Sequence, residues 1–416
     1  MLKKYYPLNT KLDQLEIIQK LSLEKFCLLN NGDKNFILGW NNNVKNDIQY
    51  NTYQDISNLK LDKNYWFGFL TYDLKNKTLP KTKSKNLDIH HFPETLFFKA
   101  SNVLIKKNNH ILYFGENKDY LSLKHILSTK KIFLKKEQIP QKIELKASTS
   151  KKDYLNNVTK IKEQIQKGNT YELNYCIQYT ASEIKINILK TYKKLIQKTN
   201  APFSSLFSYN EINILSASPE RFLQKNNLNL LSQPIKGTAK RGKTINEDQV
   251  IKKNLLNNQK EISENVMIVD LVRNDLSKIA AKNSVQVTEL CKLYTFETVH
   301  QLISTVQAKL TIDINVNSII KALFPMGSMT GAPKVASTKI IDLIENFKRG
   351  VYSGSIGFIG PNNSFDFNVV IRSILYNNKI KNLSISVGSA ITIKSISIQE
   401  YQECLLKLKA IASALE

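Results

Sequence analysis

Residues 231–242 read LSQPIKGTAKRG and place a lysine, Lys236, between a proline and a Gly-Thr turn. Pro234 fixes its own φ, and Gly237 lets the backbone pass close to whatever lies beside it. An amine held on such a turn binds a phosphate or a carboxylate, acts as a catalytic amine, or is simply solvated. Because the chain carries 60 lysines and arginines, a solvated side chain is the ordinary interpretation, and the rest of the sequence has to decide.

The segments around this stretch alternate between strand and helix patterns. A strand pattern leads into Lys236, and a long helix is predicted over residues 246–266, because Thr244 and Glu247 have the spacing of a capping box. Further strands and helices are interleaved up to a last helix over residues 399–415, with no strict βαβ alternation and no internal repeat. The pattern predicts an α/β (α+β) sandwich of mainly antiparallel sheets with helices outside.

The chain divides into two regions at a charged stretch that contains proline and serine. Residues 1–140 hold mostly short strand patterns. Within them, residues 75–86 are polar and rich in lysine, so we predict an exposed loop there. The boundary is predicted within residues 136–152 (KEQIPQKIELKASTSKK), and a second region covers residues 151–416.

The composition is that of a soluble globular protein, with 416 residues, 42% hydrophobic and 9% aromatic. A formal net charge of +25 suggests nucleic-acid binding, because clustered Lys and Arg displace counterions from phosphate. The lysines are spread along the whole chain, however, and no RNP, zinc-finger or helix-turn-helix signature accompanies them. We therefore interpret the charge as a source of solubility and of attraction for an anionic substrate, with a basic nucleic-acid-binding protein as the alternative.

The cysteines and the N-terminus indicate the compartment. No CxxC pair is present, which favours reduced thiols over disulfides or a zinc site; the cysteines are Cys27, Cys176, Cys291 and Cys404. The first residues lack the apolar core of a signal peptide, and no stretch is apolar and long enough to span a bilayer. We expect a cytoplasmic protein with no membrane partner.

Two pairs of glutamates have a spacing of three residues, Glu261 with Glu264 and Glu400 with Glu403. Residues at this spacing project from one face of a helix. Two such pairs on different helices could supply carboxylate oxygens to one Mg²⁺ ion, which prefers few carboxylates together with water and a substrate anion. On spacing alone, we favour helix capping or solvation for each pair.

Three further features have both a structural and a functional interpretation. Residues 327–334 (GSMTGAPK) form a glycine-rich turn before a predicted helix, where open amides can bind a carboxylate or merely begin the helix. His300 lies in an apolar segment, where a lone histidine is more often a hydrogen-bonded core residue than a catalyst. Arg372 lies in an apolar strand pattern, so a partner or an anionic ligand is expected, because an unpaired buried charge is costly.

The sequence resembles the chorismate-utilising enzymes, the family of anthranilate synthase component I, aminodeoxychorismate synthase component I, and the isochorismate and salicylate synthases. The resemblance covers residues 151–416 and is weaker over residues 1–140, where GFLTYDL matches. The ordered motifs that carry it are GNTYELN, SASPERF, PIKGT, ENVMIVDLVRND, GSMTGAPK, YSGSIGF, DFNVVIRS and EYQE. It implies two large, mainly antiparallel sheets packed face to face, with a chorismate-binding catalytic region and an N-terminal region packed on it.

The resemblance implies a cleft that binds chorismate together with Mg²⁺. Glu264 and Glu403 match the metal ligands of the family, with Glu261 and Glu400 in support. His300 matches a catalytic histidine beside the reacting ring. The positions that match substrate-binding residues are Gly237, Thr238, Ser328, Thr330, Tyr352, Arg372, Gly388 and Ser389.

Lys236 separates the branches of the family. Anthranilate synthases carry alanine in this motif (PIAGT), whereas PIKGT resembles aminodeoxychorismate synthases, whose lysine attacks carbon two of the ring as the hydroxyl leaves carbon four. Ammonia then resolves the adduct at carbon four. Glu220 matches the carboxylate that assists departure of the hydroxyl. Since a lysine must be neutral to attack, we expect desolvation or a nearby Mg²⁺ to lower its pKa.

The resemblance therefore implies Mg²⁺-dependent amination of chorismate to 4-amino-4-deoxychorismate, on the route to 4-aminobenzoate and folate. The alternative within the family is anthranilate synthesis. Glu172 stands where isochorismate synthases place a water-activating lysine, which argues against water as the nucleophile. No Gly-x-Cys-x-Gly elbow surrounds any cysteine of this chain, so we expect ammonia to come from a glutamine amidotransferase partner or from solution.

Overall fold

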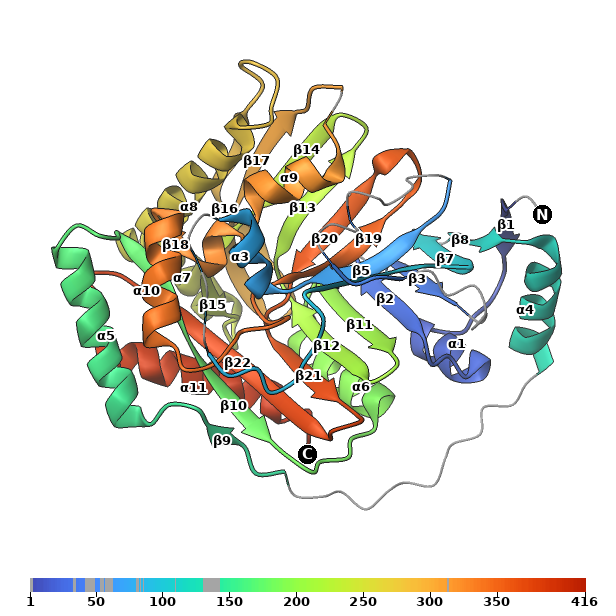
Figure 1. Ribbon diagram of the computed structural model, residues 1–416, viewed down its shortest axis with the longest axis horizontal. Coiled ribbons are helices and arrows are strands. Elements are labelled where there is room, and N and C mark those ends of the chain that lie inside the picture. Colours follow the sequence, from blue (N-terminus) through green and yellow to red (C-terminus); the bar gives the residue numbers. More distant parts are fainter. Residues whose placement is uncertain are drawn as a thin grey trace.

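The computed structural model describes residues 3–32, 35–41, 49–52, 56, 63–79, 82, 84, 86–108, 110–129, 143–312 and 314–416. Within these ranges the chain forms two large antiparallel β-sheets that pack face to face, with helices outside them (Figure 1). The predicted sandwich is therefore confirmed. No helix in these ranges is both long enough and apolar enough to cross a membrane.

The larger sheet has twelve strands in the described ranges and takes strands from both regions of the chain. β2 from the first region pairs directly with β11 from the second, for example at Leu28 and Leu206. In spatial order the strands are β1 (Lys4–Leu8), β8 (His110–Gly115), β7 (Asn102–Lys107), β3 (Phe36–Trp40), β2 (Phe26–Asn30), β11 (Phe203–Tyr209), β12 (Ile212–Ser218), β21 (Ser373–Asn377), β22 (Asn382–Ile391), β10 (Glu172–Ala181) and β18 (Gly331–Ala332), with β9 (Lys146–Ala147) also paired to β10.

The second sheet has ten strands in the same ranges and is mixed in the same way. β5 from the first region pairs with β19 from the second, so the two regions share this sheet as well. The division into residues 1–140 and 151–416 stays a prediction. In spatial order the strands are β15 (Ile235–Lys240), β17 (Val299–Lys309), β14 (Asn229–Gln233), β13 (Arg221–Asn226), β20 (Phe365–Val369), β19 (Ser355–Ile359), β5 (Trp66–Leu70), β6 (Thr95–Lys99) and β4 (Gln49–Tyr50), with β16 (Gln286–Thr295) also paired to β17.

Aromatic side chains fill the space between the two sheets. Phe69 of the second sheet meets Phe207 of the larger sheet edge to face at 5.4 Å between ring centroids, and Phe98 meets Tyr209 at 5.2 Å. All four side chains are fully buried. Because full burial of one such side chain contributes roughly 1.5–3 kcal/mol, this apolar layer is the main attraction between the sheets.

Helices cover the outer faces. The outer face of the larger sheet shares a second apolar core with α1 (Gln14–Leu21), α4 (Asn117–Thr129), α5 (Lys151–Gln166), α6 (Ile188–Thr199), α10 (Lys334–Ile344) and α11 (Ser397–Ala412). The other helices that bear on the site are α7 (Ile245–Leu256), α8 (Gln259–Ser277) and α9 (Val316–Leu323). α8 packs on β15, β16 and β17 and therefore lies beside the lysine-bearing strand.

The prediction of one long helix over residues 246–266 is wrong. The chain leaves α7 at Leu256 and begins α8 at Gln259. The Asn258 side chain accepts hydrogen bonds from the backbone N–H groups of Lys260 and Glu261, and this cap is the physical reason for the new start. Glu261 and Glu264 thus lie in the first turns of a helix and not near the end of one.

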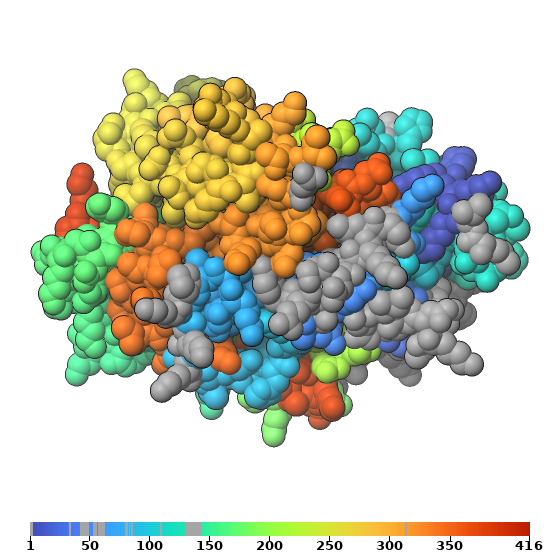
Figure 2. Space-filling view, turned by 45° about the horizontal axis from the view of Figure 1, so that its top comes forward, coloured from blue at the N-terminus to red at the C-terminus, as the bar shows by residue number. Residues whose placement is uncertain are grey.

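The prediction of an exposed loop over residues 75–86 is wrong at its start. Lys75 begins the short helix α3 (Lys75–Thr78) and is fully buried, with its ammonium 2.6 Å from Asp342 Oδ2 of α10. In Figure 2 this blue segment lies against the orange surface of the C-terminal half. Of the predicted boundary, residues 136–142 lie outside the described residues.

Candidate active site

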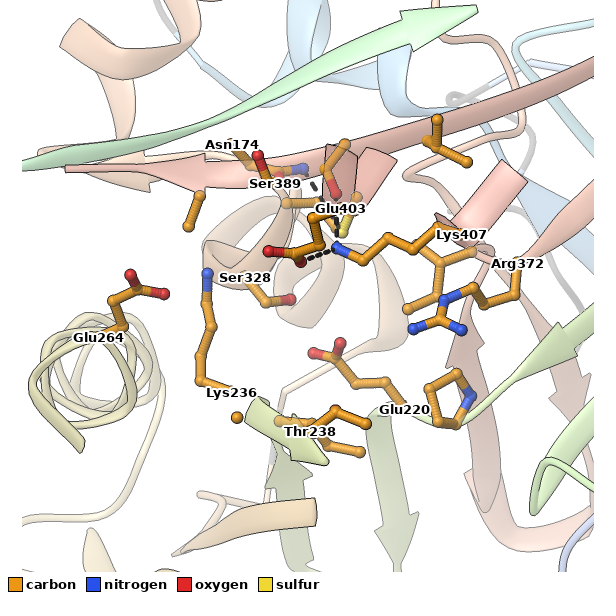
Figure 3. A pocket seen from close by; sticks show the side chains of 18 of the residues that line it. Asn174, Glu220, Lys236, Thr238, Glu264, Ser328, Arg372, Ser389, Glu403 and Lys407 are labelled. Carbon is orange, nitrogen blue, oxygen red and sulfur yellow. Dashed lines mark hydrogen bonds and ion pairs between the residues drawn. The ribbon is translucent and has the colours of Figure 1, made fainter. Parts of the chain in front are cut away.

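A cavity of about 220 Å³ lies where β15, β22, α8 and α11 meet. Figure 3 shows the side chains of Lys236, Glu220 and Lys407 pointing into it from different elements. Its lining is mostly polar or charged, unlike the apolar layer between the sheets. The lining residues used below are Asn174, Glu220, Lys236, Gly237, Thr238, Lys260, Glu261, Glu264, Gln301, Ser328, Met329, Tyr352, Arg372, Ser386, Gly388, Ser389, Glu400, Glu403 and Lys407.

The four predicted metal-site glutamates line the cavity from two helices, α8 and α11. Lysines of the same helices are paired with them. Lys260 Nζ lies 2.8 Å from Glu400 Oε1 and 3.9 Å from Glu264 Oε1, so it bridges the two helices. Lys407 Nζ lies 2.6 Å from Glu403 Oε1.

The carboxyl groups differ in how readily they ionise. Burial raises the pKa of Glu264 to about 7, and the nearby Lys236 offsets only part of that effect. Burial also raises the pKa of Glu261. In Glu403 the same burial is outweighed by Lys407, and its pKa lies below the ordinary value. Glu264 is therefore a buried carboxylate whose charge is poorly compensated by the protein.

The charges at the cavity fit a divalent cation. With Glu172 behind Lys236 included, six carboxylates meet three lysines and one arginine, so full ionisation leaves two negative charges. Glu264 Oε1 is buried without a hydrogen-bond partner. In the described part of the chain no three His, Cys, Asp or Glu side chains form a metal cluster as they stand, and ammonium groups lie against the carboxylates. The oxygens and charge suit Mg²⁺.

Lys236 lies on β15 with its side chain only 12% exposed, and its Nζ is 3.4 Å from Glu172 Oε1. Burial alone would lower the pKa of this amine. The carboxylates of Glu172, Glu264 and Glu220 outweigh burial, and the pKa of Lys236 is raised above its ordinary value. Desolvation was expected to lower it, and the surrounding carboxylates are the reason that it does not.

Glu220 follows β12 in the turn after Ser218, whose hydroxyl accepts a hydrogen bond from the Glu220 backbone N–H. Its carboxyl lines the cavity and is 5% exposed. Burial raises its pKa to about 7, although Ser328, Lys236 and a backbone N–H each lower it in part. A carboxyl with this pKa holds a proton for part of the time near neutrality, which is what a general acid needs.

Polar groups without partners among the described residues line part of the cavity, at Arg372 and Ser386. The Arg372 guanidinium donates no hydrogen bond to any described side chain. Burial lowers its pKa, and the nearby Tyr352 and Glu403 side chains offset only part of that effect. Ser386 Oγ is buried without a hydrogen-bond partner. Free guanidinium and hydroxyl donors suit a carboxylate ligand.

A buried arginine holds two parts of this wall together. Arg349 is 2% exposed and donates hydrogen bonds to the carbonyls of Met329 and Asn174, both at 2.7 Å. Its guanidinium also pairs with Glu345 at 2.6 Å. The glycine-rich turn and β10 are thereby fixed relative to each other beside the cavity.

The structure brings most of the predicted residues together. The residues that line the cavity are Glu220, Lys236, Gly237, Thr238, Glu261, Glu264, Ser328, Tyr352, Arg372, Gly388, Ser389, Glu400 and Glu403. Sequence reasoning missed Lys260, Lys407, Asn174 and Gln301. The spacing of four residues between Lys260 and Glu264, and between Glu403 and Lys407, was a signal for two of these.

The structure does not bring His300 and Thr330 to the lining. His300 Nε2 lies 2.8 Å from Asp248 Oδ1 and its Nδ1 lies 3.0 Å from Thr295 Oγ1, so the ring faces α7. Neighbouring residues of a strand point to opposite faces, and Gln301, the next residue of β17, lines the cavity instead. Thr330 is fully buried, and its hydroxyl donates to the carbonyl of Met326.

Comparisons with known proteins identify relatives of this chain. The chain is 33% identical to the aminodeoxychorismate synthase, chloroplastic, of Arabidopsis thaliana over 84% of its own length and 40% of the relative. It is 36% identical to aminodeoxychorismate synthase component 1 of Bacillus subtilis over 62% of its length and 54% of the relative. The chain spans about half the length of the curated relatives it matches.

Solved structures share the fold. Anthranilate synthase component I from Streptococcus pneumoniae superposes with a TM-score of 0.76 over 100% of this chain and 92% of that one, at 21% identity. The family model for chorismate binding enzymes matches residues 17–413. These matches support the enzyme interpretation over the nucleic-acid-binding alternative. The chain belongs to the family of chorismate binding enzymes.

Proposed function

We propose that this chain aminates chorismate at carbon four, giving 4-amino-4-deoxychorismate on the route to 4-aminobenzoate and folate. The observation that carries the proposal is the amine of Lys236 inside a cavity of carboxylates, within a motif that has alanine in the anthranilate branch. Relatives that bear the name aminodeoxychorismate synthase support it. Lys236 also weighs against anthranilate synthesis as the alternative.

In the proposed reaction Lys236 is the nucleophile and Glu220 the general acid. The neutral amine attacks carbon two of the ring, the ring double bonds shift, and the bond between carbon four and its hydroxyl breaks. The raised pKa of Glu220 lets its carboxyl give a proton to the departing hydroxyl, which leaves as water. Ammonia then attacks carbon four, and the electron pair of the carbon–nitrogen bond at carbon two returns to Lys236.

Mg²⁺ is proposed as the cofactor, held by Glu264 and Glu403 with Glu261 and Glu400 in support. The carboxylate oxygens that line the cavity and the lack of a hydrogen-bond donor to Glu264 Oε1 support this choice. When bound, Mg²⁺ supplies positive charge for the carboxylates of the protein and of the substrate. Lys260 and Lys407 have to release their glutamates for this, and their long side chains can reach solvent.

Substrate carboxylates are proposed to bind at the side with free donors. Arg372 supplies a guanidinium fork, and Tyr352 and Ser328 supply hydroxyl groups beside it. The Gly388–Ser389 segment of β22 and the Gly237–Thr238 segment of β15 form the walls between which the ring lies. Gln301 takes the lining position that was expected of His300, while Thr330 supports the turn from behind.

Ammonia is proposed to come from a glutamine amidotransferase partner. The component 1 name of the bacterial relatives supports a second component. Ammonium salts supply the same nucleophile in the absence of a partner, which makes the amination step testable alone.

The test is product identification. The purified chain is incubated with chorismate, Mg²⁺ and an ammonium salt, and products are separated and identified by mass spectrometry. We expect 4-amino-4-deoxychorismate and no anthranilate. Anthranilate as the main product, or unchanged chorismate under conditions in which the protein is folded, would refute the proposal.

A further inference from the structure

The buried partner of Lys236 is Glu172, the first residue of β10. Its side chain is 2% exposed, and its Oε1 lies 3.4 Å from Lys236 Nζ. Its other oxygen, Oε2, is buried without a hydrogen-bond partner. The backbone of Glu172 is held in place separately, since its carbonyl accepts hydrogen bonds from the hydroxyls of Thr170 and Ser337. Lys236 is therefore the group on which the Glu172 carboxylate depends for its counter-charge.

This dependence has a chemical consequence when Lys236 acts as a nucleophile. A neutral Lys236 beside an ionised Glu172 leaves a buried carboxylate with no counter-charge, which costs more free energy than a neutral pair. Transfer of one proton from the ammonium to the carboxylate removes both charges together. At 3.4 Å the two groups lie slightly beyond an ordinary hydrogen bond, so a small side-chain movement brings them to transfer distance, and neither requires access to solvent for it.

We propose that Glu172 is a further catalytic residue, the base that takes the proton from Lys236; this inference rests on the proposed function. The N–H bond of the ammonium breaks, an O–H bond forms on Glu172, and the lone pair left on Nζ forms the bond to carbon two. The adduct nitrogen is then a secondary ammonium. When ammonia attacks carbon four, Lys236 departs as a neutral amine and recovers its proton from Glu172, so the pair returns to its first state.

Other carboxylates raise the pKa of Lys236, but each has a different role in the proposed reaction. The carboxylates that act on Lys236, besides Glu172 on β10, are Glu264 on α8 and Glu220 in the turn after β12. Glu264 is a proposed metal ligand, and Glu220 gives its proton to the departing hydroxyl. Of the three, only Glu172 lies within ion-pair distance of Lys236 among the described residues. It is the carboxylate left to accept the proton.

The test uses formation of the covalent adduct, which needs no ammonia and so avoids the titration of ammonia itself. Wild type, Glu172→Gln and Glu163→Gln are incubated with chorismate and Mg²⁺ over a series of pH values, and the adduct on the peptide that contains Lys236 is measured by mass spectrometry. Glu163 is exposed on α5 and does not line the cavity, so it provides a matched change. Thermal unfolding checks that each variant is folded.

We expect Glu172→Gln to slow adduct formation roughly 100-fold or more at neutral pH, the scale of general-base catalysis. The rate of Glu172→Gln relative to wild type should then rise about tenfold per pH unit as solvent removes the proton from Lys236, because loss of the Glu220 proton above about pH 7 slows both proteins alike. Glu163→Gln should behave as wild type. A loss in Glu172→Gln that does not depend on pH would show a structural role, and a rate within a few-fold of wild type would show that no base is needed. Either result overturns the inference, whereas a wild type that forms neither adduct nor aminated product overturns the proposed function itself.

Discussion

Replacing Glu264 with glutamine should stabilise the metal-free protein while destroying its metal site. Burial raises the pKa of this carboxyl from 4.5 to about 7, so the folded state binds its proton more tightly than the unfolded chain does. The free energy of unfolding therefore falls as pH rises from about 4.5 through 7, and the loss is complete above 7. Glutamine has the same shape and no charge to bury, so it avoids that loss.

The size of the effect follows from the shift. One pKa unit corresponds to about 1.4 kcal/mol, so a shift from 4.5 to about 7 sets an upper limit of about 3.5 kcal/mol. The side chain of Glu264 is 8% exposed, so screening by solvent is small, and the shift to about 7 already includes the partial compensation by Lys236 and Lys260. We expect Glu264→Gln to be more stable than wild type by ~1–3 kcal/mol at pH 8 without metal, and close to it near pH 4.

The assay is urea unfolding with a metal chelator at both pH values, followed by Trp40 and Trp66, which are both buried. Repeating it with Mg²⁺ at about 100 times its Kd should add ~2.7 kcal/mol to wild type and almost nothing to Glu264→Gln. Glu163→Gln, at an exposed position, should match wild type throughout. The reasoning fails if Glu264→Gln is the less stable protein at pH 8 without metal. It also fails if Mg²⁺ stabilises both proteins equally.

Three further predictions concern the substrate side. Lys236→Ala and Lys236→Arg should both form no covalent adduct by mass spectrometry, because a guanidinium stays protonated; an arginine variant that still makes aminodeoxychorismate rejects covalent catalysis. Ammonium at alkaline pH should support amination by this chain whereas glutamine alone should not, as measured by product formation, and glutamine hydrolysis by the chain would contradict the need for an amidotransferase. Arg372→Ala should raise the KM for chorismate roughly 10- to 100-fold, the loss of about 1.5–3 kcal/mol from a charged hydrogen bond. An unchanged KM in steady-state kinetics would remove Arg372 from the substrate site.

The sequence predicted those site residues whose side chains follow from local spacing or motif. Glu261 and Glu264, for instance, share a helix face wherever that helix begins. It could not predict features that depend on contacts distant in sequence. Lys75 was expected in solvent, but its partner Asp342 lies 267 residues away. The local sequence of a lysine-rich segment does not indicate such a distant partner.

His300 shows a second limit of predicting site residues from the sequence. A motif match places a segment near a site, but strand alternation decides which of two neighbours reaches it. His300 and Gln301 face opposite sides of β17, and the side is set by the position of α7 with Asp248. The break between α7 and α8 was equally hard to predict, because the Asn257–Asn258 pair could continue a polar helix face or cap a new helix. A new helix begins because the backbone N–H groups of Lys260 and Glu261 donate hydrogen bonds to the Asn258 side chain.

The charges of the cavity also explain why an internal base and a cation are both needed in the proposed mechanism. Three carboxylates already hold the pKa of Lys236 above its ordinary value. An anionic substrate beside Arg372 adds negative charge, so its arrival alone favours the protonated, unreactive amine. Positive charge at Glu264 removes one of the three contributions, and a proton on Glu220 removes another. Glu172 remains as the third, and it stops opposing the neutral amine only when it carries the proton itself.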